Sequence, residues 1–233
     1  MPGAWEIIEL QRRRVLLATI SPADAKVTKF WARRVAMMQM PPGSAILDPG
    51  GMPYHAARNL ALKTAYDGGF GYLFFLDDDV IPPADMVLRL IEASRDFIGG
   101  LYFRRYPPYD PASGIGVIEK GKEQDERAVR TILPPHNPGD IIPIDFLASG
   151  STLLSRQCIE TLLKAFPRPY DWGVDIAAVP DGFGGELPKF SEDFILSYRA
   201  KELGFQPWLH TGIICPHIMT GVATNKGLEW LAM

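Results

Sequence analysis

Three consecutive aspartates give the clearest chemical signal in this sequence of 233 residues. Asp77, Asp78 and Asp79 directly follow the apolar run YLFFL at residues 72–76. Carboxylates this close repel one another, and each raises the pKa of its neighbours unless a cation lies between them. Hard oxygen ligands suit Mg²⁺ or Mn²⁺, which complete their coordination with water and substrate phosphates. The triplet therefore favours a divalent-metal site, although a turn or a helix N-terminus would account for a single aspartate.

A second acidic pair, Glu192 and Asp193, opens a predicted helix far along the chain. Ser191 is the expected N-cap of this helix, and Gly204 is the expected stop. The helix dipole favours acidic side chains in a first turn by roughly 0.3 to 1 kcal/mol, so capping alone would explain the pair. His217 lies still later, and in isolation it would be interpreted as a packing residue.

The apolar pattern predicts alternating strands and helices that would position these residues. Short apolar runs predict buried strands at residues 15–20, 45–47, 72–76 and 97–102. Helical spacing predicts helices at residues 24–38, at 53–67 and from Pro83 onward. This alternation is typical of βαβ units on a largely parallel sheet. Ligands bind such sheets at the carboxyl ends of the strands, which is where the triplet falls.

The middle of the chain changes character, because residues 104–143 are rich in proline, glycine and charge. We expect an irregular loop excursion there, with edge strands at 115–118 and 128–133. Order is expected to return at 144–154, followed by a helix that Ser155 caps. A last strand is predicted at 208–215.

Composition limits the class of protein. A formal net charge of −3 gives no electrostatic reason to expect non-specific nucleic-acid binding. The two cysteines, Cys158 and Cys215, lie far apart, which argues against a zinc site or a disulfide framework. No apolar stretch approaches the roughly 18 residues that a membrane span requires. We therefore expect a cytoplasmic protein without an integral membrane span, and leave peripheral attachment to a membrane open.

Taken together, these pieces resemble the family 2-like glycosyltransferases, which adopt the GT-A fold. The similarity extends over residues 15–218 and rests on motifs in a fixed order. These are the strand entering the triplet, Arg58-Asn59 in the preceding helix, the turn Ala148-Ser149-Gly150-Ser151, Glu192-Asp193 with Leu196 and Arg199, and His217. The resemblance implies an α/β fold: a single GT-A (Rossmann-like) domain with a mostly parallel central sheet flanked by helices.

The resemblance also implies a reaction. It is the metal-dependent, inverting transfer of a single sugar from a nucleotide-diphosphate sugar to an acceptor hydroxyl. Asp79, Asp77 and His217 would bind Mn²⁺ or Mg²⁺, which stabilises the charge that develops on the departing diphosphate. Asp193 would be the general base that deprotonates the acceptor, with Glu192 as second choice.

Further roles follow from the same resemblance. The donor would contact Thr19, Ser21, Asp48, Arg58, Asp77 and Asp78, and the acceptor side would include Gly150, Ser151 and Trp172. Residues 15–103 would form the nucleotide-sugar-binding half, 144–218 the acceptor and catalytic half, and 219–233 a C-terminal tail. A UDP-sugar is the favoured donor by family frequency. The acceptor (glycan, lipid carrier, protein or modified nucleic acid) and a homodimeric state are left open.

Two other functions remain open at this point. A sugar-phosphate nucleotidyltransferase also uses paired aspartates on an α/β sheet, but a glycine-rich loop with a basic residue usually follows its first strand. Here that position reads Ser21-Pro22-Ala23. A catalytically inactive, carbohydrate-binding GT-A protein would keep the fold without turnover. A P-loop phosphotransferase is disfavoured, because no G-x-x-x-x-G-K-[ST] segment occurs.

Overall fold

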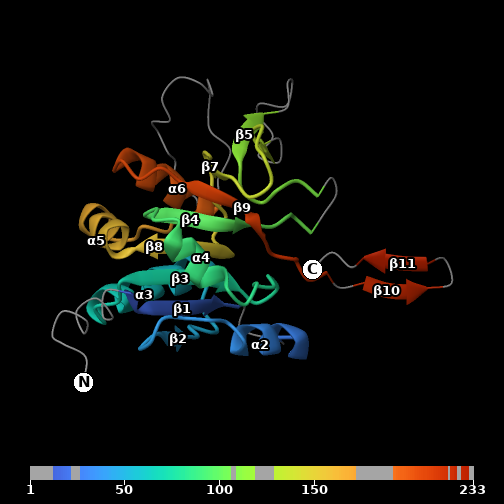
Figure 1. Ribbon diagram of the computed structural model, residues 1–233, viewed down its shortest axis with the longest axis horizontal. Helices are drawn as coiled ribbons and strands as arrows, with labels where there is room; N and C mark the ends of the chain where they lie inside the picture. Colours follow the sequence, from blue (N-terminus) through green and yellow to red (C-terminus); the bar gives the residue numbers. More distant parts are fainter. Residues whose placement is uncertain are drawn as a thin grey trace.

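The computed structural model describes residues 13–21, 27–105, 109–118, 129–171 and 191–219, together with the backbone of 221–224 and 227–230. Its centre is a seven-stranded sheet with the strand order β2-β1-β3-β8-β4-β9-β7 (Figure 1). The strands are β1 (Val15–Ile20), β2 (Ala45–Leu47), β3 (Tyr72–Asp77), β4 (Phe97–Leu101), β7 (Ile141–Pro143), β8 (Ser151–Ser155) and β9 (Trp208–Ile214).

The strand directions make this a mixed sheet. β2, β1 and β3 are parallel to one another, and β4 is parallel to β9. β8 lies between β3 and β4 and is antiparallel to both, so β4 points the same way as β3. β7 is antiparallel to β9 at the far edge. Most strands therefore share one direction, as expected, but the inserted β8 breaks the continuous parallel ladder.

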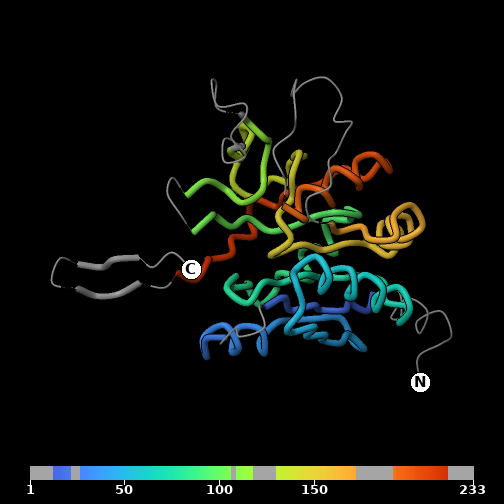
Figure 2. The backbone as a smooth tube through the Cα atoms, turned by 180° about the vertical axis from the view of Figure 1, so that it is seen from behind, coloured from blue at the N-terminus to red at the C-terminus, as the bar shows by residue number. Residues whose placement is uncertain are grey.

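Helices cover both faces of the sheet, which gives three layers (Figures 1 and 2). The helices are α2 (Lys29–Ala36), α3 (Tyr54–Asp67), α4 (Met86–Glu92), α5 (Arg156–Ala165) and α6 (Glu192–Glu202). One apolar cluster joins the sheet to α3, α5 and α6, and a second joins it to α2 and α4. Because side chains alternate along a strand, Leu73 and Phe75 of β3 enter the first cluster, whereas Phe74 and Leu76 enter the second.

The helix ends follow the capping signals in the sequence. Ser155 accepts a hydrogen bond from the backbone N–H of Cys158 at 3.2 Å, as a capping serine should. Gly204 follows α6 with φ of +86°, a left-handed conformation that glycine adopts without steric cost. α2 is shorter than expected, since Thr28 caps it at Lys29, and residues 24–26 of the predicted helix lie outside the described residues.

The excursion at 104–143 contains more regular structure than expected. β5 (Ile115–Ile118) and β6 (Val129–Ile132) pair as an antiparallel ribbon close to the predicted edge strands. β7 was not predicted, yet it completes the edge of the central sheet. β10 (Gly221–Thr224) and β11 (Gly227–Trp230) pair in the segment expected to be a tail. Among the described residues, no helix combines the length and apolarity needed to cross a bilayer.

Candidate active site

The first three strands bring their carboxyl ends to one edge of the sheet. Ile20 of β1 is paired with Asp77 of β3, and Ala18 is paired with Leu47 of β2. The residues that follow these ends, Ser21 and Asp48, therefore lie at the same edge as the triplet. Parallel pairing thus gathers the predicted donor-binding residues without any further constraint.

The chain turns within the triplet itself. β3 ends at Asp77, and Asp78 and Asp79 lie in a turn, so strand alternation does not extend across all three. Trp31 of α2 holds this turn, because its indole N–H donates to the carbonyl oxygens of Asp77 at 3.1 Å and Val80 at 3.0 Å. The three carboxylates consequently have different surroundings.

Asp79 faces His217 and Arg105. Its Oδ1 lies 3.2 Å from Nε2 of His217, and its Oδ2 lies 2.8 Å from Nη1 of Arg105. Both oxygens of this carboxylate are therefore occupied by cationic or polar partners. Asp79 and His217, two of the three residues that the family resemblance assigned to metal binding, are therefore neighbours although they lie far apart in the sequence.

A short backbone ladder brings His217 to the triplet. Val80 and His217 form an antiparallel bridge. On either side of it, the N–H of Ile81 donates to the carbonyl of Pro216 at 2.8 Å, and the N–H of Ile218 donates to that of Asp79 at 2.7 Å. These bonds fix the late histidine beside the end of β3.

The other ring nitrogen of His217 determines the tautomer. Nδ1 lies 2.7 Å from the carbonyl oxygen of Phe103, which can only accept a hydrogen bond. Nδ1 must therefore carry the proton, and Nε2 faces Asp79 either as a second N–H or as a bare lone pair. Histidines that bind metals are oriented in this way by a backbone carbonyl. Burial lowers the pKa of His217, but the hydrogen bond and charge of Asp79 outweigh it and raise the pKa overall.

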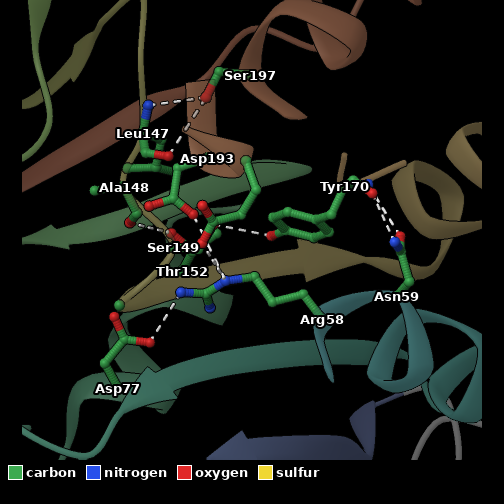
Figure 3. A network of polar contacts seen from close by, with 12 residues as sticks. Arg58, Asn59, Asp77, Leu147, Ala148, Ser149, Thr152, Tyr170, Asp193 and Ser197 are labelled. Carbon is green, nitrogen blue, oxygen red and sulfur yellow. Dashed lines mark hydrogen bonds and ion pairs between the residues drawn. The ribbon is translucent and has the colours of Figure 1, made fainter. Parts of the chain in front are cut away.

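A single buried arginine connects the triplet to the acidic pair of α6. Nη2 of Arg58 donates to Oδ1 of Asp77 at 3.0 Å. Nε of Arg58 lies 3.5 Å from Oε1 of Glu192 and 3.7 Å from Oδ1 of Asp193. Only 2% of the Arg58 side chain is exposed, so this ion pair is buried. Figure 3 shows the guanidinium between the end of β3 and the first turn of α6.

Three carboxylates share this one guanidinium, and the pKa values of two of them, Asp77 and Glu192, are raised. Burial raises the pKa of Asp77 to about 6; Arg58 opposes this shift, and the charges of Asp193 and Asp79 add to it. Burial and the charge of Asp193 raise the pKa of Glu192 to about 7. Like charges this close do not all ionise together. Partial protonation of Glu192 near neutral pH therefore relieves repulsion among the carboxylates around Arg58.

Some polar atoms of this cluster lack a hydrogen-bond partner. Within the described part of the chain, Oδ1 of Asp193 and the Nε and Nη1 atoms of Arg58 are buried without one. Leaving a buried donor or acceptor unpaired costs about 1–3 kcal/mol for each group. A polar ligand that reached this point would satisfy both an acceptor and a donor.

Aromatic residues support the arginine. The rings of Phe75 and Tyr170 lie 5.4 and 5.8 Å from the Arg58 guanidinium. Asn59 holds the backbone of Tyr170 through two hydrogen bonds, at 2.6 and 3.0 Å, and the Tyr170 hydroxyl contacts that of Ser149 at 3.0 Å. Asn59 of the helix motif and Ser149 of the small-residue turn are thus both hydrogen-bonded to Tyr170 (Figure 3).

Gly150 leaves no space for a side chain. A Cβ atom there would lie 2.7 Å from the Tyr102 hydroxyl and 2.8 Å from Oδ2 of Asp77, closer than real Cβ contacts. The Gly150 N–H donates to the Tyr102 hydroxyl at 3.1 Å. Glycine is therefore required for the close approach of β8 to the end of β3.

The remaining predicted residues have varied surroundings. Thr19 is nearly buried, and Asp48 is exposed, with its carboxylate accepting from the N–H of Gly50 at 3.1 Å. Ser151 is fully buried, and its hydroxyl donates to the carbonyl of Gly100 at 3.0 Å. Burial and the neighbouring aspartates raise the pKa of Asp78 to about 6. Trp172 lies outside the described residues.

Sequence reasoning missed several residues of this site. Trp31 and Tyr102 touch the triplet or its neighbours, yet apolar periodicity marks them only as core. Arg105 lies in the segment that the sequence predicts to be an irregular loop, and nothing in that pattern places it beside Asp79. Tyr54, the first residue of α3, has its pKa raised by burial and then by the three aspartates, so it also faces the triplet. A helix starting after Pro53 at the same sheet edge was the available signal for Tyr54.

The donor atoms fit a divalent cation with few protein ligands. Among the described residues, no group of three or more His, Cys, Asp or Glu side chains is gathered to hold a metal ion. Asp79 and His217 offer one carboxylate and one imidazole, and Arg58 holds Asp77 instead. Mg²⁺ and Mn²⁺ commonly use one or two protein groups plus substrate phosphates and water, and imidazole favours Mn²⁺. The pair suits a Mn²⁺ site that a phosphate ligand completes.

Comparisons with known proteins define the fold. No family model and no curated protein sequence matches this chain. Among solved structures, A197 from STIV has a TM-score of 0.56 at 14% identity, covering 94% of this chain and 95% of that one. GalNAc-T7 with UDP, GalNAc and Mn²⁺ also has a TM-score of 0.56, at 12% identity. That alignment covers 88% of this chain but 44% of GalNAc-T7. The architecture is therefore a GT-A-like α/β fold.

Proposed function

We propose that this protein is a metal-dependent, inverting glycosyltransferase that moves one sugar from a nucleoside-diphosphate sugar to an acceptor hydroxyl. The observation that carries the proposal is the contact of Arg58 with both Asp77 and Asp193. It unites the end of β3, where a donor and its cation would bind, with the acidic pair that would activate an acceptor. The GT-A-like fold and the UDP and Mn²⁺ of GalNAc-T7 support the same chemistry.

The donor would lie at the carboxyl edge of β1, β2 and β3. Asp79 and His217 would hold a divalent cation there, which supplies positive charge to a departing diphosphate. Phe103 keeps the His217 proton on Nδ1, so that Nε2 is available as a ligand. Asp77 would orient the donor through its fixed contact with Arg58. UDP is the favoured nucleotide.

The acceptor would be deprotonated by Asp193. Its Oδ1 is a buried acceptor without a hydrogen-bond partner among the described residues, as a general base awaiting a hydroxyl should be. Burial and the charge of Asp193 raise the pKa of Glu192 to about 7, so a proton on Glu192 would relieve its repulsion with Asp193. Attack on the face of the sugar opposite the nucleotide would invert the anomeric configuration.

The test is a thermal shift with UDP, GDP and CDP and their sugars, in Mn²⁺ and in chelator. Ligand at 100 times its dissociation constant adds about 2.7 kcal/mol, which raises the melting temperature of a domain this size by roughly 5 to 10 °C. The shift should require Mn²⁺ and should disappear in Asp79→Ala. Asp67→Ala removes an exposed carboxylate at the end of α3 and should retain it.

Product analysis then separates the other functions. Release of free nucleoside diphosphate with transfer of the sugar supports the proposal. Formation of a nucleotide sugar from a sugar phosphate would instead establish a nucleotidyltransferase. Mn²⁺-dependent nucleotide binding without turnover on any acceptor class would indicate an inactive, carbohydrate-binding protein. No shift with any nucleotide would overturn the donor site.

A further inference from the structure

Arg105 forms an ion pair with Asp79, the carboxylate that the proposed cation would need to bind. Its Nη1 lies 2.8 Å from Oδ2 of Asp79, and both side chains are about three-quarters buried, at 27% and 22% exposure. His217 already contacts the other oxygen, Oδ1. A cation that binds Asp79 must therefore share or displace the guanidinium.

The charge balance of the site explains why a guanidinium is held there. Among the described residues, five carboxylates lie at this edge together with two arginines. They are Asp77, Asp78, Asp79, Glu192 and Asp193, with Arg58 and Arg105. The formal excess among these seven residues is three negative charges, five minus two, at a pH where all five carboxylates are ionised, and protonation of Asp77 and Glu192 reduces it at lower pH. Such a site attracts cations and repels a diphosphate unless positive charge is added.

Arg58 and Arg105 differ in their freedom to move. Arg58 is 2% exposed and is enclosed by Phe75, Tyr170 and three carboxylates, so it stays in place. Among the described residues, Arg105 forms an ion pair with one carboxylate, that of Asp79, and its side chain is partly exposed. Its guanidinium can turn away from Asp79 without breaking a buried network. Arg105 is therefore the cation of this site that can be exchanged.

We infer that Arg105 is a phosphate-binding residue of the donor site. It forms an ion pair with Asp79 until a divalent cation binds Asp79 in its place. The inference rests on the proposed function, because the cation and the diphosphate are those of the donor. Once released from Asp79, the guanidinium lies next to the position where phosphate oxygens complete the cation's coordination. Its planar fork of N–H donors matches phosphate oxygens, which a lysine cannot do in the same way. Arg105 thus links cation binding to diphosphate binding.

The two halves of this exchange predict opposite effects of one substitution. Arg105→Gln removes the competitor, so Mn²⁺ alone should bind about threefold to tenfold more tightly. The same variant loses a charged donor, so at saturating Mn²⁺ the nucleoside diphosphate that binds the wild type should bind about tenfold more weakly. A residue that served only to stabilise the fold would not change the two affinities in opposite directions.

The experiment uses the full chain and two titrations. Binding of Mn²⁺ alone is followed by electron paramagnetic resonance of the free ion, and binding of UDP, GDP and CDP at saturating Mn²⁺ by calorimetry. Arg104→Gln is the matched control, since it removes the same charge from the neighbouring residue. The charge of Arg104 lowers the pKa of Asp110 and not that of a carboxylate in the triplet. This control should behave as the wild type. Equal effects in both variants would show that the loss of any nearby positive charge changes the affinities, and this would overturn the inference.

Other outcomes separate this inference from the proposed function. Unchanged or weaker Mn²⁺ binding in Arg105→Gln overturns the competition, and unchanged diphosphate affinity overturns the phosphate contact. Asp79→Ala tests the metal site itself: if it binds Mn²⁺ as the wild type does, the proposed function loses its cation. If Asp79→Ala abolishes Mn²⁺ binding while Arg105→Gln changes nothing, only the role of Arg105 fails. Absence of diphosphate binding in the wild type also overturns that role.

Discussion

Nε of Arg58 lies 3.7 Å from Oδ1 of Asp193, and the same guanidinium donates to Asp77 at 3.0 Å. The arginine comes from α3, the first carboxylate from α6 and the second from the end of β3. A buried cation that holds two acidic groups fixes their separation and orientation. The candidate base and the candidate donor site therefore move as one unit.

Replacing Arg58 by methionine should destabilise the protein strongly. The variant leaves three carboxylates without their counter-charge in a site where Arg58 is 2% exposed, which typically costs about 3–5 kcal/mol. The loss should be larger at pH 8 than at pH 5, because protonation of Asp77 and Glu192 relieves the repulsion. Urea unfolding at both pH values measures it. Arg33→Met on the exposed face of α2 is the control, and an equal loss in both variants would contradict the prediction.

Glu192→Gln should flatten the dependence of stability on pH. The pKa of Glu192 in the folded protein, about 7, lies above its ordinary value of 4.5. Its contribution to stability is therefore fully present below pH 4.5 and is lost as pH rises through 7. Between pH 5 and 8 the wild type should lose about 1–3 kcal/mol of unfolding free energy that the variant does not lose. Glu160→Gln, which alters the surface pair with Arg156, should keep the wild-type slope.

Asp193→Asn should separate binding from turnover. The amide keeps the size of the side chain but cannot take a proton, so turnover should fall by at least about 10²-fold while nucleotide affinity stays within a factor of about two. Donor binding by calorimetry and sugar transfer by product analysis provide the two readouts. Asp145→Asn changes an aspartate that pairs with Lys201 on the surface, and it should leave donor binding and sugar transfer unchanged. Wild-type turnover in Asp193→Asn would remove this residue from the base role.

His217→Ala should weaken Mn²⁺ binding by at least about tenfold, because the imidazole is one of two protein ligands in the proposed site. Titration of Mn²⁺ in the absence of nucleotide measures this directly. The variant also frees Oδ1 of Asp79, so the result tests coordination and not merely charge. His136→Ala removes an exposed histidine whose ring contacts the carbonyl of Pro134, and it should bind Mn²⁺ normally. Unchanged affinity in His217→Ala would return this histidine to a packing role.

Local signals in the sequence predicted the elements well where they are governed by local physics. The apolar runs before Asp77 and after Arg14 form β3 and β1, since continuous burial on both faces leaves few alternatives. Ser155 caps the start of α5, and Gly204 follows the end of α6, as the capping chemistry of serine and glycine predicts. β7 was missed because its three residues, Ile141–Pro143, carry no periodicity and pair only with β9.

The candidate site divides in the same way. Residue types and their positions at element ends were enough to identify candidate chemical groups: the triplet, the acidic pair at the start of α6 and a late histidine. The partners of these groups could not be predicted, because the Val80–His217 bridge and the burial of Arg58 depend on contacts between distant segments. Arg105 shows the limit, since residue type alone cannot tell a solvated arginine from one held on Asp79. That choice is made by packing and charge in three dimensions.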